Sequence, residues 1–162
     1  MHFVIGEMKG ADWTSVRAIY QEGIAGGTAT FESQVPEWPE WDRGHLRAGR
    51  LVARAEGQMV GWAALTLVSE RCAYAGVAEV SIYVMASARE NGIGKALLQA
   101  LIQASESAGI WTLQGGIFPE NQASVALHES CGFREVGRRE RLGQLNGVWK
   151  DVILMERRSK VV

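Results

Sequence analysis

The sequence predicts a single α/β domain whose mixed β-sheet is covered by helices on both faces. Strand-like apolar runs come first as a meander and then alternate with segments whose apolar residues recur at helical spacing. The chain has 162 residues, of which 47% are hydrophobic and 22% charged. This length suits one domain, and this composition is that of a globular protein rather than a disordered or collagen-like chain. We therefore expect residues 1–162 to fold around one main core.

The first half of the chain carries signals for three strands and two helices. Asp12 can cap a helix whose apolar side chains follow at helical spacing, and Gly26-Gly27 end it. An aromatic-rich connection then leads into a short helix that ends near Ala48. The turn-like triplet Glu56-Gly57-Gln58 separates two apolar runs, which indicates an antiparallel hairpin. The strands are predicted at residues 3–8, 50–55 and 59–68.

The second half of the chain alternates strands with helices. Apolar residues recur at helical spacing over residues 92–108, and Gly109 is the stop signal. Another helix is predicted from Asn121 to Cys131, where Gly132 ends it. The charged residues 156–160 are expected to form a solvated tail. The strands are predicted at residues 78–85, 111–118, 133–142 and 148–156.

Charge and apolar patterning exclude several classes of protein. Seventeen basic residues oppose eighteen acidic ones, and this net charge of −1 lacks the basic excess of a nucleic-acid-binding protein. The longest wholly apolar stretch, at residues 60–65, is far shorter than the roughly 18 residues of a membrane-spanning helix. The N-terminus lacks the pattern of a signal peptide. We therefore expect no nucleic-acid partner, no membrane partner and a cytoplasmic location.

Cysteine and tryptophan positions indicate structural roles. Cys72 and Cys131 have neither CxxC spacing nor a nearby pair of histidines, so we expect two reduced thiols and no metal site. Four tryptophans lie in periodic apolar segments, which favours places in the core over stacking on a ligand. These four are Trp13, Trp62, Trp111 and Trp149.

Residues 84–95 have the pattern of an anion-binding turn, because a strand leaves its sheet and glycines then open a long helix. Glycines let phosphates approach the backbone, while free N–H groups and the helix dipole stabilise negative charge. Two nucleotide motifs do not fit. Lys95 is followed by Ala96 instead of the Ser or Thr of a P-loop, and Leu97 stands where a dinucleotide fold has its third glycine. The simpler alternative is a glycine-rich helix start without a ligand.

This turn also carries a resemblance to a known family. Arg89-x-x-Gly92-x-Gly94 resembles the acetyl-CoA signature R/Q-x-x-G-x-G/A of the GCN5-related N-acetyltransferases. The resemblance covers essentially the whole chain and is closer to the phosphinothricin and methionine sulfoximine acetyltransferases. It implies a mixed, mostly antiparallel sheet of about six or seven strands flanked by about four helices, and a homodimer. Five further stretches support it: residues 27–32, 71–74, 78–84, 121–124 and 127–133.

The resemblance implies acetyl-CoA as co-substrate and a site for it. The backbone of the strand that ends at Val84 would pair with the pantetheine arm, the following turn would receive the pyrophosphate, and the start of the helix at Asn121 would contact the cofactor. The implied cofactor-binding residues are Ile82, Tyr83, Val84, Arg89, Glu90, Asn91, Gly92, Ile93, Gly94, Lys95, Asn121 and Ser124.

Two residues are candidates for proton transfer. Glu79 lies in a mainly apolar strand, on the same face as Ser81 and Tyr83, and an ammonium must lose a proton before it can attack a thioester. Glu79 is therefore the candidate base. The alternatives are that its carboxylate binds the substrate ammonium without taking its proton, or that it is a strand residue that faces solvent. His128 follows Asn121 by nearly two helical turns. The resemblance gives it the place of a tyrosine that protonates the departing thiolate, and the alternative is a histidine on the helix surface.

The acceptor is expected to bind between two loops and the strand of Glu79. Arg71 and Tyr74 precede this strand in a loop that could cover the acceptor, and arginine suits bidentate capture of a carboxylate or phosphinate. In the resembling branch, the loop that corresponds to Thr28, Thr30 and Phe31 helps to form the wall of the acceptor pocket. The alternative is that these three residues simply pack on the core. The substrate-binding candidates are Thr28, Thr30, Phe31, Arg71, Tyr74, Glu79 and Ser81.

These features predict an N-acetyltransferase that moves acetyl from acetyl-CoA to the α-amino group of a small amino-acid-like acceptor, of the phosphinothricin, methionine sulfoximine or methionine sulfone type. The amine would attack directly in a ternary complex, and backbone N–H groups near Val84 and Met85 would polarise the thioester carbonyl. The alternatives are an acetyltransferase for a protein N-terminus or a polyamine, and an acyl-CoA sensor without turnover.

Overall fold

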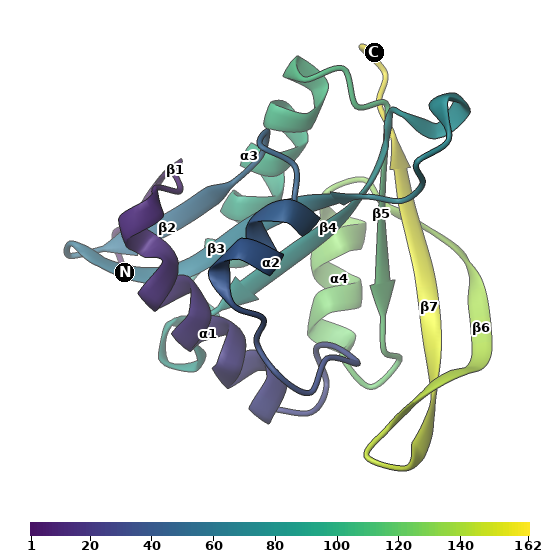
Figure 1. Cartoon of the computed structure of the whole chain (residues 1–162), viewed down its shortest axis with the longest axis horizontal. Helices are drawn as coiled ribbons and strands as arrows, with labels where there is room; N and C mark the ends of the chain where they lie inside the picture. Colours follow the sequence, from purple (N-terminus) through teal and green to yellow (C-terminus); the bar gives the residue numbers. More distant parts are fainter.

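One seven-stranded sheet runs through the chain in the computed structural model, which describes all 162 residues (Figure 1). The strand order is β1-β2-β3-β4-β5-β7-β6, and every neighbouring pair is antiparallel except β4 and β5. The mixed, mostly antiparallel sheet of the prediction is thus confirmed. The strands are β1 Val4–Glu7, β2 Leu51–Ala55, β3 Gln58–Leu67, β4 Val77–Val84, β5 Thr112–Ile117, β6 Arg134–Leu145 and β7 Val148–Arg158.

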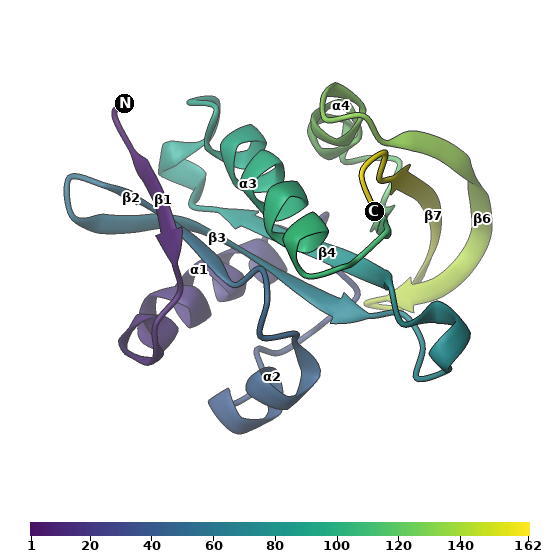
Figure 2. The same cartoon turned by 90° about the horizontal axis from the view of Figure 1, so that it is seen from above.

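Four α-helices cover the two faces of the sheet (Figure 2). One face carries α1 and α2, and the other carries α3 and α4, as the prediction of helices on both faces requires. None of the helices has the length and apolar character needed to cross a membrane. The helices are α1 Trp13–Ala25, α2 Trp38–Gly44, α3 Ile93–Ser107 and α4 Gln122–Ser130.

The sheet separates two hydrophobic cores, where the sequence predicted one main core. The larger core lies under α3 and includes Leu97 and Ala63, and the smaller one lies under α1 and α2 and includes Trp41 and Trp62. Neighbouring residues of a strand point to opposite faces, so β3 supplies both cores and is buried over most of its length.

The strands β4 and β5 stay paired over only three residues and then separate. Their parallel register joins Val77 to Thr112, Ala78 to Leu113 and Glu79 to Gln114, and it ends there. Beyond Glu79, β4 continues on β3, while β5 continues on β7 (Figure 1). The edge of β4 that faces β5 therefore has no ladder partner from residue 80 onward. This opening between two strands of one sheet positions the site.

Two expectations about side chains at the ends of elements are wrong. Asp12 precedes α1 in helical conformation, and its carboxylate accepts from the Lys9 N–H at 2.8 Å and from Arg54 at 2.5 Å, so it does not cap α1. Trp149 is not a core residue, because it lies near the tip of the β6–β7 hairpin with 49% of its surface exposed.

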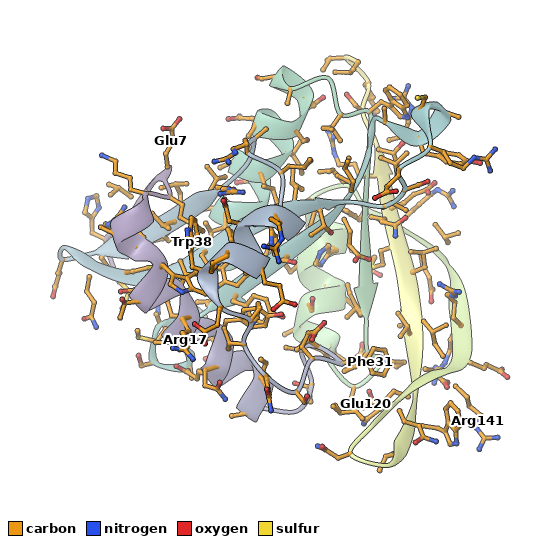
Figure 3. All side chains as sticks on the ribbon, viewed as in Figure 1. Glu7, Arg17, Phe31, Trp38, Glu120 and Arg141 are labelled. Carbon is orange, nitrogen blue, oxygen red and sulfur yellow. The ribbon has the colours of Figure 1, made fainter.

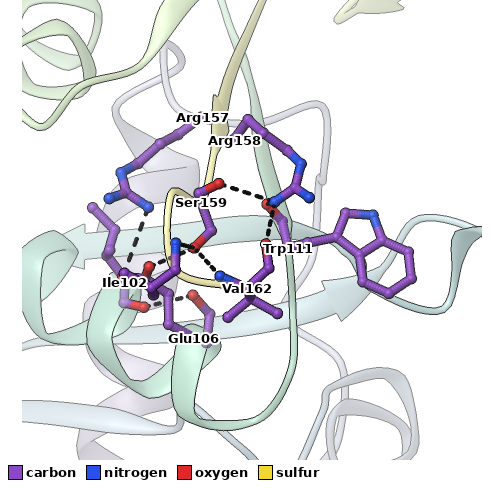
Figure 4. A network of polar contacts seen from close by, with 9 residues as sticks. Ile102, Glu106, Trp111, Arg157, Arg158, Ser159 and Val162 are labelled. Carbon is purple, nitrogen blue, oxygen red and sulfur yellow. Dashed lines mark hydrogen bonds and ion pairs between the residues drawn. The ribbon is translucent and has the colours of Figure 1, made fainter.

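The C-terminal residues are anchored rather than solvated, which corrects the expected tail. β7 extends to Arg158, whose guanidinium donates to the carbonyl oxygens of Trp111 and Val162 at 3.0 and 2.8 Å. The buried Ser159 donates to the carboxylate of Glu106 at the end of α3 (Figure 4). These contacts hold the chain end against α3 and the start of β5.

Candidate active site

The opening between β4 and β5 leads into a cavity of about 370 Å³. Its walls come from the loop after α1, from β4 and β5 beyond their paired ends, from α4, and from the β6–β7 hairpin. Both proposed proton-transfer residues line it, together with six of the other candidates. The predicted site residues in the wall are Thr30, Phe31, Glu79, Ser81, Ile82, Tyr83, Ser124 and His128.

Glu79 and His128 reach the cavity from opposite faces of the sheet. A side-chain carbon placed on Gly115 of β5 would lie 3.3 Å from Nε2 of His128, whereas one placed on Gly116 would lie 4.0 Å from Oε1 of Glu79. Consecutive strand residues point to opposite faces. The two glycines leave the space around β5 open, so a base on one side and an imidazole on the other border the same cavity.

His128 is buried, with 5% of its surface exposed, so its alternative placement on the helix surface is wrong. Nδ1 lies 2.7 Å from the carbonyl oxygen of Ser124, and we assign the ring proton to Nδ1 because a carbonyl only accepts. Burial lowers the pKa of His128, although the hydrogen bond to Ser124 opposes this shift. Nε2 is buried without a partner. The neutral ring therefore presents an unprotonated nitrogen to the cavity.

Glu79 and Tyr83 face the side of the sheet that carries α1. Oε1 of Glu79 accepts from the side-chain amide of Gln114 at 3.5 Å, across the last paired residues of β4 and β5. The ring of Tyr83 stacks against Trp62 at 4.9 Å and fills the space that Gly23 leaves open in α1. Burial, with a smaller contribution from Tyr20, raises the pKa of Tyr83, so its hydroxyl stays protonated.

The backbone of β4 offers hydrogen-bonding groups to the opening. The N–H of Met85 donates to the carbonyl oxygen of Val60 at 2.8 Å, so the backbone N–H of Met85 points to β3. Because backbone groups alternate in direction along an antiparallel pair, Val84 and Ile82 point the other way, toward the opening. The expected use of the Met85 N–H on a thioester is therefore wrong, while the Val84 N–H is suitably directed.

The turn before α3 has the geometry of an anion cradle. Glu90 and Gly92 have φ values of 64° and 80°, in the left-handed region, and nothing lies within 4 Å of the space above Gly92. No side chain caps α3, so its first N–H groups are available. Asn91 fixes the turn by donating to the carbonyl oxygens of Ala88 and Arg89 at 3.1 and 3.0 Å. This cradle fits a diphosphate.

The residues that flank this turn contribute to it in three different ways. Arg89 and Lys95 are exposed and form no ion pair, so their charges are available beside the cradle. The side chain of Ile93 lies in the larger core, which leaves only its backbone for a ligand. Gly94 lets Leu127 of α4 approach, since a side-chain carbon on Gly94 would lie 3.3 Å from Leu127.

The loop after α1 is held across the cavity. Phe31, which is labelled in Figure 3, packs edge-on against Phe118 with ring centres 4.8 Å apart, and a side-chain carbon placed on Gly143 of the hairpin would lie 3.1 Å from its ring. Asn121 accepts from the Ser124 N–H at 3.2 Å and donates to the carbonyl oxygen of Thr28 at 3.3 Å. Asn121 thus caps α4 and ties the loop to it, while Thr28 itself lies outside the cavity wall.

Arg71 and Tyr74 are not brought to the cavity. They lie beside the 3₁₀ turn Cys72–Tyr74, ahead of β4, at the end where β4 and β5 are still paired. Both are exposed, and the Arg71 guanidinium stacks 5.7 Å from the Tyr74 ring centre. Neither side chain contributes to the cavity wall of this chain.

Sequence reasoning missed several wall residues. Glu32 ends a stretch that supported the resemblance, yet its carboxylate was not assigned to the site. The pair Gly115-Gly116 inside a strand is a signal for close approach of another group, and it could have been used. Leu142 and Val152 come from the closing hairpin, and no local pattern points to them.

Comparison with known proteins agrees with this geometry. The profile of the acetyltransferase (GNAT) family matches residues 13–133. Phosphinothricin N-acetyltransferase of Alcaligenes faecalis is 34% identical over 152 residues, covering 90% of this chain and 77% of the relative. The L-methionine sulfoximine/L-methionine sulfone acetyltransferase of Pseudomonas aeruginosa PAO1 is 31% identical, with 90% and 88% covered.

Solved structures share the fold over almost the whole chain. A phosphinothricin acetyltransferase from Sinorhizobium meliloti, in complex with acetyl-CoA, has a TM-score of 0.87 at 31% identity, covering 98% of this chain and 89% of the other. A ribosomal-protein-alanine N-acetyltransferase from Brucella melitensis has a TM-score of 0.89 at 32% identity, with 96% and 99% covered. The family profile and these relatives show that this chain belongs to the GNAT family and is an acetyl-CoA-dependent N-acetyltransferase.

Proposed function

We propose that the chain acetylates the α-amino group of a small amino-acid-like acceptor of the phosphinothricin, methionine sulfoximine or methionine sulfone type. The observation that carries this proposal is the meeting of Glu79 and His128 in one cavity, at the point where β4 and β5 separate. A cavity of about 370 Å³ is suited to a small molecule. The names of the Alcaligenes and Pseudomonas relatives support this class of acceptor.

Acetyl-CoA supplies the acetyl group as an activated thioester. The free edge of β4 at Ile82 and Val84 would hold the pantetheine arm, and the backbone around Gly92 would hold the diphosphate, with Arg89 and Lys95 adding positive charge. On α4, Ser124 lines the same cavity, and Asn121 caps the start of this helix. The Val84 N–H would stabilise negative charge on the thioester oxygen.

Proton removal is divided between the two faces of the sheet. An amino acid in neutral water is mostly ammonium, so a proton must leave before nitrogen can attack. Glu79 accepts it, directly or through water. His128 carries no proton on Nε2 at rest, so it can protonate the departing sulfur only after receiving one. After the attack the nitrogen must lose a second proton as the C–S bond breaks; in this scheme that proton passes to Nε2 of His128 and from there to the thiolate.

The test is release of free CoA thiol from acetyl-CoA in the presence of defined acceptors. The panel contains phosphinothricin, methionine sulfoximine, methionine sulfone and ordinary amino acids, and mass spectrometry identifies the N-acetyl product. Turnover that depends on at least one member of the first three supports the proposal. Tight binding of acetyl-CoA with no turnover on the whole panel would instead favour a sensor.

A protein N-terminus is the second candidate acceptor, favoured by the likeness to the Brucella structure. A peptide with a free N-terminal alanine is the corresponding substrate. Higher kcat/KM on this peptide than on every amino acid of the panel would replace the first proposal. The loop held over the cavity by Phe31 argues for a small acceptor, because an extended peptide needs an open groove.

The homodimer is also part of the proposal. β6 forms one edge of the sheet and is exposed along almost its whole length, and apolar side chains stand out from the hairpin, including Leu142 and Trp149. Edge strands of this kind are ready to pair with another chain. Sedimentation velocity should give the mass of two chains. Trp149→Arg should give the mass of a single chain. Val4→Arg, on the opposite edge strand β1, is the control that should stay dimeric.

A further inference from the structure

The cavity wall carries two carboxylates and no cationic side chain. Glu32 lines it from the loop after α1, and Glu79 lines it from β4. His128 is the one wall residue able to carry positive charge, and burial lowers its pKa, which favours the neutral ring. The wall of this chain therefore has a net negative charge, although the chain as a whole is nearly neutral.

Glu32 has a fixed position on the rim. Its N–H donates to Oγ1 of Thr30 at 3.1 Å, which closes a short turn around Phe31, and the Phe31 ring is packed against Phe118. Glu32 is exposed as well as part of the wall, so its side chain is in contact with solvent. An acceptor that enters the cavity passes this charge.

The negative charge of Glu32 affects groups on the face of the sheet that carries α1, toward which Glu79 and Tyr83 point. Burial raises the pKa of Tyr20 to about 12, and the negative charge of Glu32 adds to this rise. Glu32 has the same effect on Tyr83, where burial is again the main cause. Tyr83 lines the cavity and Tyr20 packs on it with ring centres 4.9 Å apart, so the Glu32 charge acts on groups beside the space in which the acceptor would lie.

No cationic side chain of the wall itself offsets these carboxylates. Lys150 is not a wall residue, and its Nζ lies 6.0 Å from the ring centre of the wall residue Phe118. The guanidinium of Arg141 lies over Trp149 on the hairpin, and Arg71 lies outside the cavity. A second anionic group on the acceptor would meet repulsion without a partner.

We propose that Glu32 is a specificity-determining residue that disfavours acceptors with an anionic group beyond the α-carboxylate. This inference rests on the proposed amino-acid acceptor. Methionine sulfone has a neutral side chain and phosphinothricin an anionic one, and both carry the same ammonium and α-carboxylate. The neutral acceptor is therefore the preferred one, because the attraction of the ammonium is common to both acceptors and only the phosphinate is repelled by the two carboxylates.

The experiment compares kcat/KM for these two acceptors at saturating acetyl-CoA and low salt. The wild-type protein should favour methionine sulfone. Glu32→Gln keeps the size of the side chain and should raise kcat/KM for phosphinothricin about fivefold, while the value for methionine sulfone stays within about twofold or falls. Glu32→Lys should enlarge the shift to about tenfold or more. The control Glu40→Gln removes an exposed carboxylate in α2, outside the cavity wall, and should change neither value.

Each other outcome counts against the inference. An unchanged ratio in both Glu32 variants, with turnover intact, would overturn the role of Glu32 and leave the proposed function standing. If the wild-type protein prefers phosphinothricin and Lys150→Gln abolishes this preference, the phosphinate is bound by Lys150, and the inference is wrong. Absence of turnover on either acceptor would overturn the proposed function, and the inference with it. A shift that stays the same at high salt would count against the electrostatic origin.

Discussion

His128 donates from Nδ1 to the carbonyl oxygen of Ser124, one helical turn earlier in α4, at a distance of 2.7 Å. This bond fixes the ring and the tautomer, so the unprotonated Nε2 points to Gly115 and the cavity. A backbone carbonyl is thus the group that makes His128 a proton acceptor at rest.

Turnover should persist to a lower pH than an ordinary histidine would allow. Because burial lowers the pKa of His128 from its ordinary value of 6.5, more than half of the rings are neutral at pH 6.5, and the midpoint of the acid fall in kcat/KM should lie at a lower pH. His128→Gln should reduce kcat by about a hundredfold. His45 is also half-buried with a lowered pKa, but it stacks on Trp41 outside the cavity. The control His45→Gln should keep the acid limb, and a loss of that limb in this control would contradict the assignment.

Stability should decrease in acid for the same physical reason. The unfolded chain binds a proton on His128 near pH 6.5, whereas the folded chain binds it only at lower pH, so the free energy of unfolding falls as pH falls below 6.5. His128→Gln should weaken this dependence in denaturant titrations at several pH values. An unchanged slope with pH would argue that His128 is not buried in solution.

Replacing Glu79 should affect chemistry more than cofactor binding. Glu79→Gln removes the carboxylate on the acceptor face and leaves the cradle before α3 intact, so kcat should fall about a hundredfold or more while the Kd for acetyl-CoA changes less than about twofold. Gln114→Glu tests the neighbouring position, since the side-chain amide of Gln114 donates to Glu79. Equal losses of kcat and of affinity in Glu79→Gln would assign it a structural role.

The cradle before α3 should require glycine at position 92. A side chain at a φ of 80° is strained, by roughly 1–2 kcal/mol, and it would occupy the open space above the turn. Gly92→Val should therefore weaken acetyl-CoA binding about tenfold or more, measured by calorimetry. Gly57→Val is a matched control, because Gly57 has a φ of 78° and open surroundings in the β2–β3 turn. It should lose similar stability and keep its affinity.

Asn121 should have two separable roles. Asn121→Ala removes the oxygen that caps α4 and should lower the free energy of unfolding by about 1 kcal/mol. Asn121→Asp keeps that oxygen but loses the donor to Thr28, so stability should be retained while KM for the acceptor rises. If both variants bind the acceptor like the wild type, the link between α4 and the loop does not shape the acceptor site.

Local sequence patterns were sufficient for most of the fold. The elements, the hairpin and the glycine turn before α3 depend on residues close together in the chain, and their boundaries agree with the structure within a few residues. Asp12 was misassigned because the helix-like turn before α1 directs its carboxylate to Lys9. Trp149 follows an apolar pattern in a strand that ends beyond both cores.

The sequence by itself determined the two-faced sheet, the cradle at Gly92 and the presence of Glu79 in a strand, because apolar period and backbone freedom are local properties. Only the tertiary structure decided which groups share the cavity. Pairing of β5 with β7 draws it away from β4 after Glu79, and this long-range pairing brings His128 and Glu32 to the opening while leaving Arg71 and Tyr74 at its closed end. Such partners are far apart in the chain, so no local pattern records their meeting.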